Sequence, residues 1–311
     1  MAKLAVFPKC YLKDLVEGRM SLEDWIQRAS VLDVDGLELY MGFLRSHDSD
    51  YLGQIRKRIE ESGLEMPMMC YSPDFTIPDE ETRGQEVTKQ QEAIKITAEL
   101  GGQFCRTLSG QRRPDVELDE GIKWVVDAIG ESLETAQQSN VIVVIENHYK
   151  DDFWEYPEFA QKAEVFLAVT QQIDSPWFGI QYDPSNAIVA GEDPLELLDA
   201  LKRQVRTMHA SDRYLAAGHT LDELRQADGT VGYSPHLRHG VIGQGLNDYD
   251  AIFRTLKEVG FDSWISIEDG TNGMDELHES AAFLRRKMTQ WGLAESGGQP
   301  AQRNTRRTAS V

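Results

Sequence analysis

Four residues that could bind a metal ion stand at or near the ends of apolar runs. Glu146 ends VIVVIE, Asp183 ends FGIQYD, His209 lies near the end of VRTMHA, and Glu268 lies near the end of WISIED. If these runs are neighbouring strands of one parallel barrel, their carboxyl ends converge on one mouth. Three carboxylates meeting there would repel one another unless a cation lay among them. Three oxygen ligands and one nitrogen ligand, with open positions, suit Mn²⁺, Mg²⁺ or Co²⁺ better than a closed structural zinc site.

Each of these residues also has an ordinary structural explanation when it is taken alone. A glutamate at a strand end can be a helix cap or an ion-pair partner, Asp183 before a proline can begin a turn, and His209 can be a core histidine. Their common register on four successive runs favours the metal site.

A second imidazole follows closely, in the stretch VIENH. Side chains alternate along an extended strand, so we expect His148 on the same side as Glu146 and one step further out. A neutral imidazole beside a cation could remove a proton from a carbon next to a carbonyl group that the cation polarises. We predict that His148 is a general base; the alternative is a supporting or loop-capping role.

The elements that must position these residues are short β-type runs that alternate with helical segments. The runs are LAVFP (4–8), GLELY (36–40), EMPMMCY (65–71), QFCRT (103–107), VIVVIE (141–146), FGIQYD (178–183), VRTMHA (205–210) and WISIED (264–269). Nearly continuous apolar runs are typical of a parallel sheet covered on both faces. Eight such units predict an α/β fold, the (β/α)8 TIM barrel. A doubly wound nucleotide-binding sheet would need a phosphate turn such as GxGxxG, which the sequence lacks.

Three helical segments carry clear local signals. SLEDWIQRASVL begins with Ser21 as an N-cap, followed by acidic residues in its first turn. GIKWVVDAIGESLETAQQ places apolar residues on one face, and DYDAIFRTLKEVGF has aspartates at its start and a glycine at its end.

We expect one barrel domain over residues 1–292, with one unusually long connection at 213–247. Only TLDELRQ within this connection has a helical pattern. A long irregular connection is usually a lid, a binding loop or an interface, and this one falls on the catalytic face of a barrel. The end of the chain, 293–311, is polar and rich in Gly, Ser and Gln, so we predict a disordered tail.

The charge and composition of the chain disfavour nucleic acid and membranes as binding partners. The chain has 311 residues and a formal net charge of −20, so it repels nucleic-acid phosphates and anionic lipid. It has no apolar run of membrane-spanning length, and we expect no signal peptide because MAKLAVFPKC has no extended apolar segment followed by a small-residue cleavage site. Its cysteines, Cys10, Cys70 and Cys105, form no CxxC pair, as expected of reduced thiols. We expect a cytoplasmic protein that binds a small molecule and neither nucleic acid nor a membrane.

The motifs VIENH, QYDPSNA, MHASDR, GQGLNDYDAIF and WISIEDG, in this order and spacing, resemble the xylose-isomerase-like TIM barrels of the sugar phosphate isomerase/epimerase superfamily. The resemblance covers almost all of residues 3–290. It implies that Glu146, Asp183, His209 and Glu268 are the metal ligands and that the two glutamates also exchange the substrate proton.

The resemblance also indicates where the substrate lies. Arg213 follows HASD, close to the position at which the family often places an arginine on the substrate. Asn186 stands where many epimerases have a substrate-binding histidine, which is a departure from simple ketose epimerases. We expect substrate contacts from Tyr40, Asn186, Arg213 and His239.

One branch of the superfamily resembles this chain more closely: the catalytic subunits of bacterial C-glycoside deglycosidases and related enzymes acting on 3-oxo-glycosides. That branch has an E-N-H element, matched here by Glu146, Asn147 and His148, whose histidine is a base beside Mn²⁺. It also has a small β-type partner subunit. The resemblance implies a lyase, because a 3-oxo group acidifies the C2 proton of a glucoside and the aglycone can then leave from C1.

Three alternatives stay open: an isomerase or 3-epimerase of a free or phosphorylated sugar, another metal-dependent barrel activity, and a non-catalytic sugar-binding protein. The same superfamily contains the DNA-repair AP endonucleases, which the sequence disfavours. Those enzymes use three zinc ions and extra histidines from earlier strands, whereas LELY, MMCY and CRTL carry none here. The acidic charge also disfavours DNA.

Overall fold

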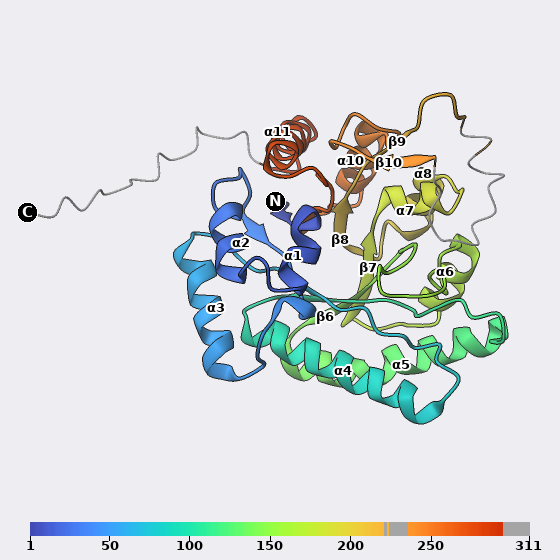
Figure 1. Ribbon diagram of the computed structural model, residues 1–311. Coiled ribbons are helices and arrows are strands. Elements are labelled where there is room, and N and C mark those ends of the chain that lie inside the picture. The colour runs from blue at the N-terminus through green and yellow to red at the C-terminus, as the bar shows by residue number, and fades with distance from the viewer. Residues whose placement is uncertain (221–222, 224–235, 295–311) are drawn as a thin grey trace, which may run out of the picture.

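The computed structural model describes residues 1–220, 223 and 236–294. Its centre is a parallel sheet curled into a barrel (Figure 1). The strands are β1 (Lys3–Val6), β2 (Gly36–Leu37), β3 (Leu39–Tyr40), β4 (Met68–Cys70), β5 (Phe104–Thr107), β6 (Ile142–Glu146), β7 (Phe178–Tyr182), β8 (Val205–Ala210) and β11 (Trp264–Ile267). Their order is β2-β1-β11-β8-β7-β6-β5-β4-β3. Since β2 and β3 are two halves of the run 36–40, both ends of this order meet on one segment, and the barrel closes as predicted.

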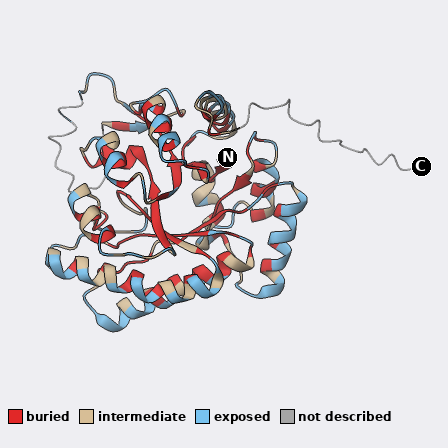
Figure 2. Ribbon diagram, turned by 180° about the vertical axis from the view of Figure 1, so that it is seen from behind, coloured by how far each residue is buried: buried red, intermediate tan, exposed pale blue. Residues whose placement is uncertain are grey.

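Helices surround the barrel and turn their apolar faces towards it. They are α1 (Leu12–Val16), α2 (Leu22–Ala29), α3 (Ser49–Glu61), α4 (Glu80–Glu99), α5 (Leu118–Ser139), α6 (Ala163–Thr170), α7 (Pro184–Val189), α8 (Pro194–Leu201), α10 (Tyr249–Glu258) and α11 (Met274–Gln290), with short 3-10 turns at Lys9–Tyr11 and Met41–Phe43. Figure 2 shows buried residues along the strands and exposed residues on the outer helix faces.

The three predicted helix signals are confirmed. Ser21 caps α2 in a reciprocal capping box with Asp24, a type of cap that contributes about 1 kcal/mol. Helix α5 buries Val125 and Ile129 against the core. Helix α10 begins after Asp248, whose side chain accepts a hydrogen bond from the backbone of Ala251, and Gly260 beyond its end has a φ of +74°, which favours glycine.

The connection at 213–247 differs from the irregular segment that we expected. Its two described ends pair as antiparallel strands, β9 (Arg213–Leu215) and β10 (Leu237–His239), with Arg213 opposite His239. Three-residue strands are too short to show an alternating pattern in the sequence. Most of the expected TLDELRQ helix lies outside the described residues.

The barrel extends slightly further than predicted at its C-terminal end. Leu293, which we assigned to the tail, is buried, and its carbonyl accepts a 2.7 Å hydrogen bond from the backbone N–H of Ala2. The predicted disorder falls on 295–311, outside the described residues. Within the described part of the chain, no helix is both long and apolar enough to cross a membrane.

Candidate active site

The carboxyl ends of four neighbouring strands bring the predicted metal ligands together. Glu146, Asp183, His209 and Glu268 each offer one ligand atom, and these atoms all lie within 4.8 Å of one another. All four residues are buried. Nδ1 of His209 lies 3.2 Å from Glu146 and 3.3 Å from Glu268. We call these four residues the ligand cluster.

Asp183 combines its predicted role with helix capping. It is the N-cap of α7, with Pro184 at the first helical position. Its Oδ1 accepts hydrogen bonds from the backbone of Ser185 and Asn186 at 2.8 and 3.0 Å, and from Ser211 Oγ at 2.7 Å. All three bonds use Oδ1, which leaves Oδ2 as the oxygen for a cation.

Two amides hold the cluster in register. The side chain of Asn147 donates to the carbonyl of Asp183 at 2.7 Å and accepts from its N–H at 2.8 Å, so it ties the end of β6 to the end of β7. Asn186, predicted to contact the substrate, donates to Oε1 of Glu146 at 3.3 Å. Both amides therefore orient the cluster.

The charges of the cluster fit a divalent cation. Burial and the negative charges of Glu268 and Glu146 raise the pKa of Asp183 to about 7. Burial also raises the pKa of Glu146, but the positive charges of His209 and Arg106 outweigh it and hold that pKa at about 2. Asp183 is thus the carboxylate of the cluster that the protein's own cations compensate least. Hard oxygen ligands with one imidazole suit Mn²⁺ or a similar ion.

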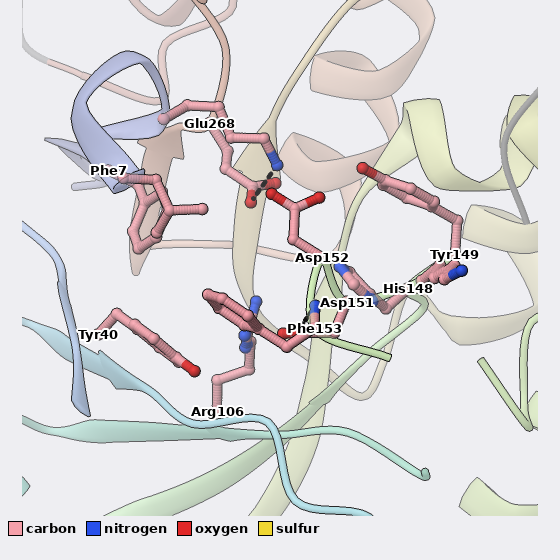
Figure 3. A pocket seen from close by; sticks show the side chains of 12 residues that line it. Phe7, Tyr40, Arg106, His148, Tyr149, Asp151, Asp152, Phe153 and Glu268 are labelled. Carbon is pink, nitrogen blue, oxygen red and sulfur yellow. Dashed lines mark hydrogen bonds and ion pairs between the residues drawn. The ribbon is translucent and has the colours of Figure 1, made fainter. Parts of the chain in front are cut away.

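A pocket reaches Glu268 of the cluster (Figure 3). Glu268 and Arg106 belong to its lining, and Tyr40 and His148 face it from opposite sides. Phe153, in the loop that follows β6, also lines it. Burial lowers the pKa of His148, but the carboxylates of Glu158 and Glu146 outweigh burial and raise it above its ordinary value. The predicted base, Glu268 of the cluster and one predicted substrate residue thus line a single cavity.

The comparison with protein families agrees with this geometry. The model of a family described as a xylose isomerase-like TIM barrel matches residues 26–287. The chain belongs to this family. The superfamily expected from the sequence motifs is therefore confirmed.

Curated relatives of this xylose isomerase-like barrel are distant. A 3-oxo-isoapionate decarboxylase of Pectobacterium atrosepticum is 33% identical over 96 residues, a match that spans 31% of this chain and 31% of the relative. An L-ribulose-5-phosphate 3-epimerase, UlaE, of Salmonella paratyphi A is 21% identical over 76% of this chain and 78% of its own length.

Solved structures show the same fold. A D-tagatose 3-epimerase-like protein has a TM-score of 0.73 at 19% identity and covers 93% of this chain and 98% of its own. The IOLI protein with a binding zinc atom has a TM-score of 0.68 at 16% identity and covers 93% and 97%.

Sequence reasoning missed a buried carboxylate behind the ligand cluster. Glu38 interrupts the run GLELY between β2 and β3, and its Oε2 lies 2.8 Å from Nε2 of His209. The Sγ of Cys70 lies 3.9 Å from the same oxygen. His209 is thereby held from behind while its Nδ1 faces the cluster, as is usual for metal-ligating histidines. The missed signal was a charged residue inside an otherwise apolar strand.

Two cations beside the cluster were missed as well. Arg106 donates from Nη1 to Glu146 at 2.8 Å and from Nη2 to Ser72 at 2.9 Å. Lys9, just after β1, lies 3.1 Å from Glu268. The signal that could have identified them is a single basic residue near the carboxyl end of an apolar run, Lys9 after LAVFP and Arg106 in QFCRT.

Two residues predicted to contact the substrate lie behind the pocket lining. Nη1 of Arg213 donates to Nε2 of His239 at 2.8 Å, and Nδ1 of His239 donates to Asp269 at 3.1 Å. The guanidinium of Arg213 also stacks over the ring of Tyr149, with 5.3 Å to the ring centroid. Tyr149 itself lines the pocket. A direct role of Arg213 and His239 in substrate binding stays a prediction.

Proposed function

We propose that the protein is a metal-dependent enzyme of sugar metabolism that removes the proton next to a carbonyl group, and that it eliminates the aglycone of a 3-oxo-glucoside. The observation that carries the proposal is the pocket that His148 lines together with Glu268, one of the four residues of the ligand cluster. Membership of the family supports a sugar substrate. The similarity to a relative named 3-oxo-isoapionate decarboxylase supports a substrate that carries a 3-oxo group.

The ligand cluster would hold one divalent cation, Mn²⁺ in the first place and Mg²⁺ or Co²⁺ as alternatives. When bound, such a cation polarises a carbonyl group and stabilises negative charge on its oxygen. His148 takes the C2 proton. The electron pair of the C2–H bond ends in a C1=C2 double bond, while the aglycone leaves with the C1 bonding pair and takes up a proton. The products are an unsaturated 3-oxo sugar and the free aglycone, so no oxidant or reductant is consumed.

His148 is a better base than the glutamates of the cluster. Glu146 is held ionised by His209 and Arg106, and coordination to a cation lowers its proton affinity further. Glu268 is similarly committed to Lys9 and His209. The imidazole of His148 is not part of the ligand cluster, and although burial lowers its pKa, Glu158 and Glu146 raise it above the ordinary imidazole value, so the neutral ring accepts a proton more readily.

The second candidate is a sugar isomerase or ketose 3-epimerase. It is favoured by the 3-epimerase UlaE, whose match covers 76% of this chain. In that reaction Glu146 and Glu268 would move the proton between the two faces of the substrate carbon. A small β-type partner subunit and a cytoplasmic location also belong to the proposal, and both rest on the sequence alone.

One assay separates these candidates. The purified protein is incubated with an aryl 3-oxo-glucoside, a free ketose, a ketose phosphate and a 3-oxo sugar acid, each with Mn²⁺ and with EDTA. We expect aglycone release from the 3-oxo-glucoside with Mn²⁺ and none with EDTA. Epimerisation of a ketose without aglycone release would overturn the lyase in favour of the second candidate, and CO₂ release from the acid would overturn both.

A further inference from the structure

A buried carboxylate faces the imidazole of His148 from outside the pocket. Glu158 lies between β6 and α6 and has only 1% of its surface exposed. Its Oε2 lies 3.5 Å from Nδ1 of His148. Within the described part of the chain, both atoms are buried and neither has a hydrogen-bond partner, so each is the nearest polar group left for the other. Glu158 is not among the residues that line the pocket, and its carboxylate faces the site at His148.

The other oxygen of Glu158 is anchored firmly. Its Oε1 accepts hydrogen bonds from the backbone N–H and the hydroxyl of Ser109, at 2.7 and 2.5 Å. Ser109 is itself fixed, because its hydroxyl accepts a 3.0 Å bond from the backbone of Ala160. The backbone N–H of Glu158 donates to the carbonyl of Tyr149 at 2.9 Å. The carboxylate therefore cannot swing away from His148.

A purely structural role would not need a charge at this place. Burying a carboxylate is costly unless it is paired, and the two donors from Ser109 satisfy only Oε1. Among the described residues, His148 is the one ion-pair partner of Glu158. A neutral glutamine could accept both bonds from Ser109 equally well. The charge of Glu158 is therefore explained by its ion pair with the imidazole of His148.

We propose that Glu158 is a positioning residue for His148. Its Oε2 accepts the Nδ1 proton, which fixes the tautomer whose bare Nε2 faces the pocket, and it stabilises the imidazolium that forms when Nε2 takes the substrate proton. Carboxylates act on histidines in this way in hydrolase triads and around metal ligands. The ring of Tyr149, stacked on His148 with centroids 5.0 Å apart, holds the imidazole plane. The catalytic part of this inference rests on the proposed function.

The test compares Glu158→Gln with Glu158→Asp. Glutamine keeps the size of the side chain and both bonds to Ser109, but it presents an N–H group to Nδ1. We expect kcat on the 3-oxo-glucoside to fall by about 10²-fold or more, while KM and Mn²⁺ content stay at their wild-type values. Aspartate keeps the charge and restores part of kcat. A Glu158→Gln enzyme with wild-type kcat would overturn the proposal.

A second readout needs no substrate. Nitrogen-15 NMR of histidine-labelled protein, with the signal of His148 assigned through a His148→Gln variant, reports which ring nitrogen carries the proton. We expect Nδ1–H in the wild type and a shift towards Nε2–H in Glu158→Gln. Nε2–H in the wild type would overturn the positioning role. The expected tautomers in a protein without lyase activity would uphold it and reject only the proposed reaction.

A third variant covers the case in which Glu158→Gln fails to fold. Ser109→Ala removes one of the two donors to Oε1 and leaves the carboxylate charge in place. It should lower kcat by a smaller factor and broaden the His148 signal, because the carboxylate is held less firmly. An unchanged kcat together with an unchanged signal would overturn the proposal in that case.

Discussion

The carboxylate of Asp183 caps α7 and is also a predicted metal ligand, and mutations can separate these two roles. Asp183→Ala should lose the cap of α7, about 1 kcal/mol of stability, and also the predicted metal ligand. Asp183→Asn should keep the cap, because its amide oxygen still accepts from Ser185 and Asn186, but it lacks the charge that a cation needs. We therefore expect low Mn²⁺ content in both variants, measured by elemental analysis, and a lower melting temperature for the alanine variant.

The matched control is Asp193, which caps α8 ahead of Pro194 and is exposed. Asp193→Ala removes a cap of the same kind at a residue outside the ligand cluster, so it should lose stability and keep its metal. Full Mn²⁺ occupancy in Asp183→Ala would contradict the ligand assignment.

His148 makes the sharpest prediction at the scale of single residues. Its replacement by alanine should leave the fold and the metal content intact, because its side chain is not part of the ligand cluster. Activity should fall by about 10²–10⁴-fold, the usual contribution of a positioned proton-transfer group. Exchange of the substrate's α-proton with deuterated solvent, followed by NMR, should slow in parallel.

The control for His148→Ala is His47→Ala, which removes an exposed imidazole paired with Glu92 and should leave the rate unchanged. If His148→Ala binds metal and turns over substrate at nearly the wild-type rate, the proton must pass through Glu146 or Glu268. The epimerase would then become the first candidate.

The sequence predicts which four residues form the ligand cluster, but not the residues that hold them in place. Each of the four residues can be recognised in the sequence because it lies at or near the end of an apolar run. The barrel topology then brings the ends of these runs together. Glu38 acts through His209, which lies 171 residues away, and Lys9 reaches Glu268 across 259 residues. Such contacts depend on which side chains face each other across the closed barrel, and one sequence carries no local pattern for them.

At the scale of elements, all eight strand runs were found, and the errors have local causes. The run GLELY was predicted as one strand, but it breaks at Glu38, whose side chain turns inward to His209. The hairpin of β9 and β10 was missed because its strands are three residues long, too short to show an alternating pattern. Helix boundaries with caps, such as Ser21 and Asp248, were predictable because capping chemistry is local.

Asp212 should control how firmly the 213–247 connection is attached to the barrel mouth. Its carboxylate accepts four backbone bonds, from Arg213, Gly243, Gly245 and Asn247, at 2.8–3.2 Å. Hydrogen bonds to a charged group contribute about 1.5–3 kcal/mol each in favourable cases. Asp212→Ala should therefore raise amide hydrogen exchange across 236–247, as measured by mass spectrometry.

The exchange of β6 and β7 provides the internal reference for Asp212→Ala, because the strands themselves do not depend on these bonds. A global rise in exchange would show that the residue supports the whole barrel. Unchanged exchange in 236–247 would show that the connection is held by other contacts.

At the scale of the whole molecule, the charge distribution favours an uncharged sugar over a phosphorylated one. The chain has a net charge of −20, which repels anionic substrates at long range. The pocket lining has three cations, Lys9, Arg106 and Lys150, and three carboxylates, Asp151, Asp152 and Glu268. The charges of these cations and carboxylates cancel, whereas binding a phosphate group would require more positive than negative side chains in the lining. This balance agrees with a neutral glucoside as the substrate.

The ligand cluster should also couple metal binding to the stability of the entire barrel. Its four residues come from the carboxyl ends of β6, β7, β8 and β11, which are consecutive in the sheet. A cation there replaces repulsion between buried carboxylates with a link across four strands. Binding to the folded state at about 100 times Kd adds about 2.7 kcal/mol. At about 2–4 °C per kcal/mol, Mn²⁺ should raise the melting temperature by about 5–10 °C over EDTA in a calorimetric scan.

Asp183→Ala should show no such rise, whereas Asp193→Ala should show all of it. Equal melting temperatures of the wild type in Mn²⁺ and in EDTA would mean that the four side chains are held together by their own hydrogen bonds and ion pairs, and the metal-dependent mechanism would lose its basis.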